Sequence, residues 1–365
     1  MQFDFFPSRS LTIYLAKTFI IRILAVLLML VLILQMLDLL GESGKVLGYP
    51  GNGEEQLWHY VGLRFPQLIA RFLPYSVLLA TIITLATLNQ NSEVVAMKAA
   101  GMSAHQVLAP LLLSAGLLSG LSFVFNERIV TRASATLEAW QDVDYGKIPV
   151  DSGVRSNVYL TDGSDILSAA SISGRDRAMV MEGVTFYTRD QHQMISREIH
   201  SPRATYAAPG WLLEAPVQFD VQSATTTKLQ PLVLGKDITP TQVALSKVDA
   251  DGENVFELRH SIHLLDAAGR RTAELKGKWW HKFSGPLSAM LMPLLGAVAA
   301  FGLARSGQLL IRAVIGMALG FAYFVVDNAA LAMGNFGGYP PLLAAWAPFL
   351  LFFLIGETVL IRTEE

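Results

Sequence analysis

Three long apolar stretches near the start of the chain and three more near its end enclose over a hundred residues of alternating, soluble-looking sequence. A membrane-spanning helix needs about 20 mostly apolar residues, and each stretch is that long. This layout predicts an integral membrane protein with one folded domain outside the bilayer. The six predicted spans are residues 19–40, 66–88, 104–125, 283–303, 310–333 and 342–361.

The composition agrees with a membrane protein and excludes several functions. Of the 365 residues, 52% are hydrophobic and 16% charged, whereas ordinary soluble domains carry about 25% charged residues. A net charge of −2 gives no overall basic field, so nucleic acid is not an expected partner. The chain has no cysteine and no catalytic or dinucleotide-binding fingerprint. We therefore expect no catalytic residue, no cofactor and no metal.

The sequence pattern changes in the middle of the chain, where short runs with period-two alternation are separated by turn signals about every ten residues. That pattern favours an antiparallel β sandwich or jelly roll. The expected organisation is three transmembrane helices in residues 1–145, a β-jellyroll-like domain in 146–255, and a linker helix with three further spans in 256–365. The fold class is thus an α-helical membrane protein with an inserted all-β domain.

The basic residues in the short loops predict how the spans are oriented, because cytoplasmic loops carry an excess of lysine and arginine. The short loops on the side that carries the β domain offer only Lys45 and Arg64, fewer cations than the loops on the opposite side. Both termini are therefore expected in the cytoplasm, with the β domain on the periplasmic side. The cations assigned to the cytoplasmic side are Arg9, Lys17, Lys98, Arg305, Arg312 and Arg362. The approach to the first span, residues 11–22, is amphipathic and is expected to lie in the membrane interface before turning in.

Residues 90–102 join the second and third spans and can form a short helix at the cytoplasmic surface. Ser92 can cap this helix, Glu93 suits its positive end, and Gly101 can end it. Such a helix is suited to docking into a groove on a cytosolic partner; a plain connecting turn is the alternative. Its apolar flank and second charge come from Val94, Val95, Met97 and Lys98.

The segment from Asn91 to Ser103 resembles the coupling-helix motif of the LptF/LptG family. Members of this family are permease subunits of the ABC transporter that extracts lipopolysaccharide from the inner membrane. The resemblance covers nearly the whole chain, including the six spans, the inserted β domain and the lack of an ATPase domain. Residues 320–328 in the fifth span resemble the LptG branch of the family.

The resemblance implies a non-catalytic subunit that works with several partners. These are a cytosolic ABC ATPase dimer, a homologous six-span permease of the LptF type, a periplasmic bridge protein, an LptC-like protein anchored in the inner membrane, and lipopolysaccharide. A membrane receptor whose β domain senses an envelope ligand is the alternative from another class. An intramembrane enzyme is disfavoured, because the spans lack paired catalytic residues.

The resemblance also assigns roles to particular residues. Glu93 matches the family's coupling glutamate, which is expected to pair with a basic residue of the ATPase, with Val94, Met97 and Lys98 beside it. Asp38, at the end of the first span, keeps the family's acid near the phosphates of lipid A. Gln35 stands where a lysine is expected, so only Lys45 remains at this corner.

Arginines elsewhere can replace the missing lysines, because the guanidinium fork matches phosphate oxygens. The alternative for each arginine is snorkelling or pairing with Glu127 or Glu138. The candidate arginines for lipopolysaccharide binding are Arg64, Arg71, Arg128 and Arg132.

Two carboxylates fall within the predicted spans, where a charge is costly and usually faces the protein interior or water. Glu357 is near enough to the cytoplasmic end to reach water. Asp327 is the stronger functional candidate, and a structural hydrogen bond to a neighbouring helix is the alternative. His260 and His263 are three residues apart without an evident third ligand, so we expect surface residues there rather than a metal site.

Overall fold

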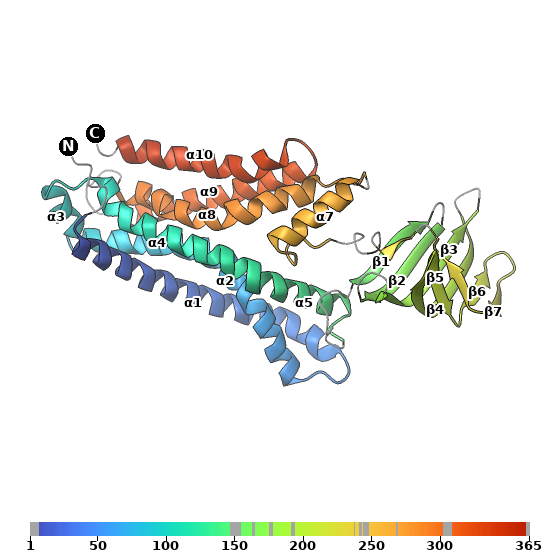
Figure 1. Ribbon diagram of the computed structural model, residues 1–365. Helices are drawn as coiled ribbons and strands as arrows, with labels where there is room; N and C mark the ends of the chain where they lie inside the picture. Colours follow the sequence, from blue (N-terminus) through green and yellow to red (C-terminus); the bar gives the residue numbers. More distant parts are fainter. Residues whose placement is uncertain are drawn as a thin grey trace.

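The computed structural model shows a bundle of long helices with a β domain beyond one end of it (Figure 1). Helix α1 begins and α10 ends at the opposite end of the bundle, where the short helix α3 also lies. One end of the bundle therefore carries α3 and the chain termini, and the other end carries the β domain. The structure describes residues 7–146, 155–162, 165–174, 178–190, 194–236, 238–240, 243, 248–267, 269–301 and 309–362.

Six long helices correspond to the six predicted spans. Five of them, in the described part of the chain, are long and apolar enough to cross a membrane: all except α8. A span at α8 therefore stays a prediction. Residues 304–308, between the fourth and fifth predicted spans, lie outside the described residues. The helices are α1 (Arg9–Gly48), α2 (Glu54–Gln90), α4 (Ala104–Phe125), α8 (Ala273–Phe301), α9 (Leu309–Asn335) and α10 (Pro341–Arg362).

Two helices differ from the expected course near their ends. Helix α1 runs without interruption from Arg9, so the predicted change of direction after an interfacial segment is wrong. Helix α4 continues through a π-helical turn, η1 (Asn126–Val130), into α5 (Thr131–Asp142), so the helix of the third predicted span extends well beyond residue 125. The linker helix expected at the start of 256–365 is α7 (Val255–Ala267), and Gly269, with φ +69°, lies just after its end.

Small residues allow α9 and α10 to pack closely near the β-domain end of the bundle. A Cβ atom added to Gly334 of α9 would lie 2.5 Å from the Cβ of Ala344 in α10. Ala344 is fully buried and has no flexible side chain to move aside. A glycine is therefore required at this crossing for steric reasons.

Replacing Gly334 by alanine is expected to destabilise the bundle by about 1–3 kcal/mol, the usual cost of overpacking. The matched control is Gly41→Ala in α1, where an added Cβ meets nothing within 4 Å. Alanine at that position gains up to about 1 kcal/mol of helix propensity. Thermal unfolding in detergent measures both, and a Gly334→Ala variant as stable as the native chain would contradict the steric argument.

The inserted domain is one antiparallel sheet, which confirms the predicted antiparallel β structure and is consistent with a β-jellyroll. The strand order is β1-β2-β3-β4-β5-β8, and β6 pairs with β4 and β7. Apolar side chains of the sheet, with Trp211 fully buried among them, form a separate core. The strands are β1 (Arg155–Asp162), β2 (Asp165–Ser173), β3 (Val180–Arg189), β4 (Ile195–Ala207), β5 (Gly210–Glu214), β6 (Val217–Asp220), β7 (Thr225–Lys228) and β8 (Leu232–Leu234).

The long strand β4 divides the sheet into two branches. Its first half pairs with β6 and its second half with β5, while β3 runs along its other edge. Pro202 lies where the branches separate, a place suited to a residue without a backbone N–H donor. The buried Oγ of Ser201 lies 2.8 Å from the carbonyl oxygen of Arg203 and 2.5 Å from that of Glu214. Donation of its single proton to Glu214 links β4 to the end of β5.

Candidate functional site

The predicted coupling helix exists as α3 (Glu93–Ala99), at the end of the bundle far from the β domain (Figure 1). Gly101 ends it as expected: with φ +82°, its N–H donates to the Lys98 carbonyl at 3.0 Å. The predicted cap is wrong, because Ser92 has φ 58° and its side chain makes no capping hydrogen bond. The amide of Asn91 instead donates to the Glu93 carboxylate at 3.2 Å.

The side chains of α3 divide into an anchoring face and an accessible face. Val94 and Met97 are buried against the core of the bundle, so within this chain they hold α3 in place. Glu93 is partly exposed, and Val95 on the accessible face is 63% exposed. A partner that docks on α3 would therefore meet Glu93, Val95 and the exposed Lys98.

Glu93 also has a contact within this chain that the sequence did not indicate. The hydroxyl of Tyr14 in α1 donates to the two Glu93 carboxylate oxygens at 3.2 and 3.4 Å. The two residues are 79 positions apart, and no motif connects them. The contact holds the Glu93 carboxylate against α1, and Tyr14 is a neutral donor that brings no opposite charge to it.

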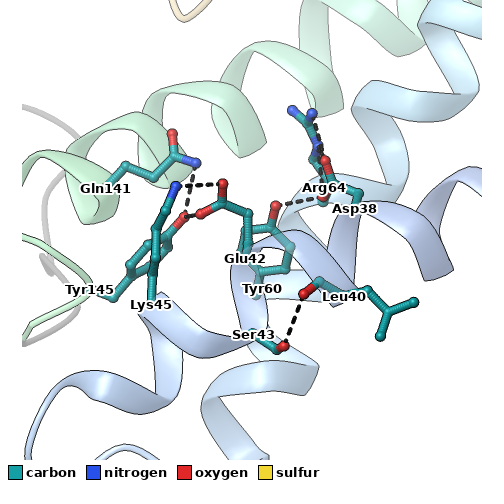
Figure 2. A network of polar contacts seen from close by, with 9 residues as sticks. All are labelled: Asp38, Leu40, Glu42, Ser43, Lys45, Tyr60, Arg64, Gln141 and Tyr145. Carbon is teal, nitrogen blue, oxygen red and sulfur yellow. Dashed lines mark hydrogen bonds and ion pairs between the residues drawn. The ribbon is translucent and has the colours of Figure 1, made fainter.

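At the other end of α1, the structure pairs two candidate lipid-binding residues with each other (Figure 2). Asp38 accepts hydrogen bonds from Nη2 of Arg64 at 3.0 Å and from the Tyr60 hydroxyl at 2.5 Å. Nη1 of Arg64 donates to Gln67 at 2.8 Å. The Arg64 charge is therefore compensated inside the chain, and Arg64 acts between α1 and α2.

Lys45 is also in an ion pair, but in an accessible one. Its ammonium contacts Glu42 at 2.8 Å, and its side chain is 67% exposed (Figure 2). An exposed pair of this kind contributes at most about 1 kcal/mol, so it separates easily. The second oxygen of Glu42 accepts from the Tyr145 hydroxyl at 2.8 Å. Burial, aided by Glu42, raises the pKa of Tyr145 to about 12, which keeps this hydroxyl a donor at neutral pH.

The other three candidate arginines differ from Arg64 because no described acid forms an ion pair with them. Arg71 in α2, Arg128 in η1 and Arg132 in α5 are exposed, and none has an ion pair with a described residue. Arg128 and Arg132 are four residues apart on continuous helix, so their side chains project in similar directions. Among the described candidate arginines, these two are the pair that a single helix presents together.

Glu127, the acid next to Arg128, pairs with Lys282 and not with one of the candidate arginines. Glu127 contacts the Lys282 ammonium at 3.4 Å, and these side chains are 14% and 8% exposed. Glu127 also accepts from the backbone N–H of Val255 at 2.6 Å. Since Val255 begins α7, this buried pair joins η1, α7 and α8 where the chain returns from the β domain.

The carboxylate of Asp327 in α9 hydrogen-bonds to a neighbouring helix. It is 6% exposed, and its Oδ2 lies 2.9 Å from Nε2 of His281 in α8. Glu357 of α10 likewise faces His105 of α4 at 3.3 Å. Both contacts bridge helices, which supports the structural alternative for Asp327. Among the residues that the structure describes, no three or more histidines or carboxylates gather in a way that could hold a metal ion.

Comparisons with known proteins agree with this architecture. The family described as "Lipopolysaccharide export system permease LptF/LptG" matches residues 13–362. Among similar proteins is the lipopolysaccharide export system permease protein LptG of Escherichia coli K12, 24% identical over 365 residues that cover 98% of this chain and 99% of that protein. LptG of Haemophilus influenzae is 23% identical over 361 residues, covering 96% and 98%. With its apolar helices and inserted β domain, the chain belongs to the LptF/LptG family of inner-membrane lipopolysaccharide export permeases.

Proposed function

We propose that this chain is the LptG-type subunit of a transporter that takes lipopolysaccharide from the outer leaflet of the inner membrane and passes it to a periplasmic bridge. One observation carries the proposal: the accessible face of α3, which includes Glu93, and the β domain lie at opposite ends of the bundle. Exposed arginines of η1 and α5 lie on the side toward the β domain. An energy source docked at one end can thus act on a lipid at the other.

The energy must come from a partner. Removing acyl chains from lipid costs about 0.8 kcal/mol per CH₂ group, and lipopolysaccharide carries several chains. In the proposed mechanism a cytosolic ABC ATPase dimer binds α3 through Glu93 and moves the bundle against a homologous LptF-like permease. The lipid is displaced from between the two permeases toward the β domain.

The proposed orientation places both termini and α3 in the cytoplasm and the β domain, residues 146–255, in the periplasm. There the β domain would contact an LptC-like protein and the bridge. Six spans are proposed, with α8 as the fourth: its first turns carry Lys276, Lys278 and Trp279, side chains typical of the headgroup layer.

Arg128 and Arg132 are proposed to hold the phosphates of lipid A beside the root of the β domain. A charge-assisted hydrogen bond contributes about 1.5–3 kcal/mol. Replacing both arginines by glutamine is expected to weaken lipopolysaccharide binding on the order of 100-fold. Binding of labelled lipopolysaccharide to the purified transporter, with its ATPase and sister permease, measures the effect.

The control is Lys45→Gln, which removes an exposed cation already paired with Glu42 and is expected to weaken binding less than the arginine pair. Equal effects of the two changes would contradict the assignment of the phosphates to Arg128 and Arg132. A native chain that binds lipopolysaccharide but co-purifies with a signalling kinase instead of an ATPase would favour the receptor alternative and overturn the transport proposal.

A further inference from the structure

The chain enters the β domain through a turn at residues 143–146 that follows α5; we call it the entry turn. Two residues of this turn, Asp144 and Tyr145, have φ values of 50° and 58°. Non-glycine residues in this left-handed region are disfavoured, so the surrounding structure must hold them there. The conformation of the entry turn is therefore set by its contacts.

Those contacts come largely from the connection between α1 and α2. The amide Nδ2 of Asn52 donates to two backbone carbonyls, that of Tyr145 at 2.7 Å and that of Val46 at 2.8 Å. One amide group thereby ties the entry turn to the end of α1. The indole Nε1 of Trp140 in α5 donates to the carbonyl of Gly146 at 2.8 Å.

Apolar and aromatic packing reinforces these hydrogen bonds. Tyr145 is buried together with Trp140, Tyr60 and Val46, separately from the main core of the bundle. The rings of Trp140 and Tyr145 meet edge to face with centroids 5.2 Å apart. A Cβ added to Gly146 would lie 3.1 Å from the Tyr49 ring, so a side chain there would press against that ring.

We propose that the α1–α2 connection is a clamp that fixes the orientation of the β domain relative to the membrane helices, with Asn52 as its positioning residue. The same end of α1 carries Glu42, whose carboxylate accepts a hydrogen bond from the Tyr145 hydroxyl (Figure 2). During transport, a displacement of α1 would therefore move the entry turn, through which the chain reaches the β domain. The effect of an α1 displacement during transport rests on the proposed function. The existence of the clamp does not depend on that function.

The two roots of the β domain provide a matched pair of substitutions. Asn52→Asp removes both N–H donors and places a carboxylate beside two carbonyl oxygens. At the other root, Asn254 uses only its side-chain oxygen, which accepts from the N–H groups of Phe256 and Glu257 at 3.0 Å each. Asn254→Asp keeps that acceptor, so the same chemical change leaves the second root intact.

The experiment measures the distance between the clamp and the sheet by pulsed electron paramagnetic resonance. Because the chain has no native cysteine, single cysteines at the exposed Leu47 and Ser223 take spin labels specifically. The full chain in lipid nanodiscs, without lipopolysaccharide or ATPase, is expected to give one narrow distance. Asn52→Asp should raise the population outside that distance on the order of tenfold, and Asn254→Asp should leave it unchanged.

A second variant covers the case in which Asn52→Asp fails to fold. Tyr145→Phe keeps the buried ring but loses the hydrogen bond to Glu42, and a smaller broadening in the same direction is expected. The proposal would be overturned if every clamp variant that folds kept the same narrow distribution of distances between the two spin labels as the native chain. The result is independent of transport, because neither substrate nor energy source is present in the measurement.

Discussion

Replacing Glu93 by lysine is expected to abolish stable association with the ATPase while leaving the β domain folded. Reversing the charge at a docked ion pair removes an attraction and adds a repulsion, which costs about 2–5 kcal/mol or more. Glu93 lies on the accessible face of α3, so the change disturbs little of the packing within this chain. Co-purification of the ATPase from native membranes measures the effect, and a loss of at least about 30-fold is expected.

The control separates docking from the internal contact of Glu93. Tyr14→Phe removes the hydroxyl that donates to the Glu93 carboxylate but keeps the charge. We expect this variant to retain most of the bound ATPase. If Tyr14→Phe were as damaging as Glu93→Lys, the carboxylate would serve to hold α3 against α1. Full ATPase recovery with Glu93→Lys would remove Glu93 from the coupling role.

Much of the helical bundle could be predicted from the sequence, because apolar length is a local property. The positions of α2 and α4 follow from runs of apolar residues, and the end of α3 follows from Gly101. Ser92 precedes α3 as predicted, but it takes the left-handed conformation and its side chain makes no capping hydrogen bond, so the predicted side-chain cap is wrong. A cap depends on a backbone conformation that residue type alone does not determine.

The partners of the charged residues could not be predicted, because they are distant in the sequence. Asp38 and Arg64 were both candidates for phosphate contact, but the antiparallel packing of α1 on α2 brings them together across 26 positions. Composition likewise gave no sign that Asn52 reaches a carbonyl 93 residues away. In the β domain, alternation predicted antiparallel strands but not that β4 pairs with both β5 and β6.

Breaking the buried ion pair between Glu127 and Lys282 is expected to be the most destabilising single change at the root of the β domain. Lys282→Met leaves the Glu127 carboxylate without its cation in a largely buried site. Removing one partner of a buried pair costs about 3–5 kcal/mol. The loss should appear as a lower midpoint of thermal unfolding in detergent, and Glu127→Gln should have an effect of similar size because it leaves the lysine uncompensated.

The double variant Glu127→Gln with Lys282→Met tests whether the destabilisation comes from an uncompensated charge. Both changes together leave a neutral site, and the glutamine oxygen can still accept from the N–H of Val255. The double variant is therefore expected to be more stable than either single variant, since neutral replacements of buried pairs are often tolerated. Additive losses would show that the two side chains act independently and that η1 and α8 are joined by packing alone.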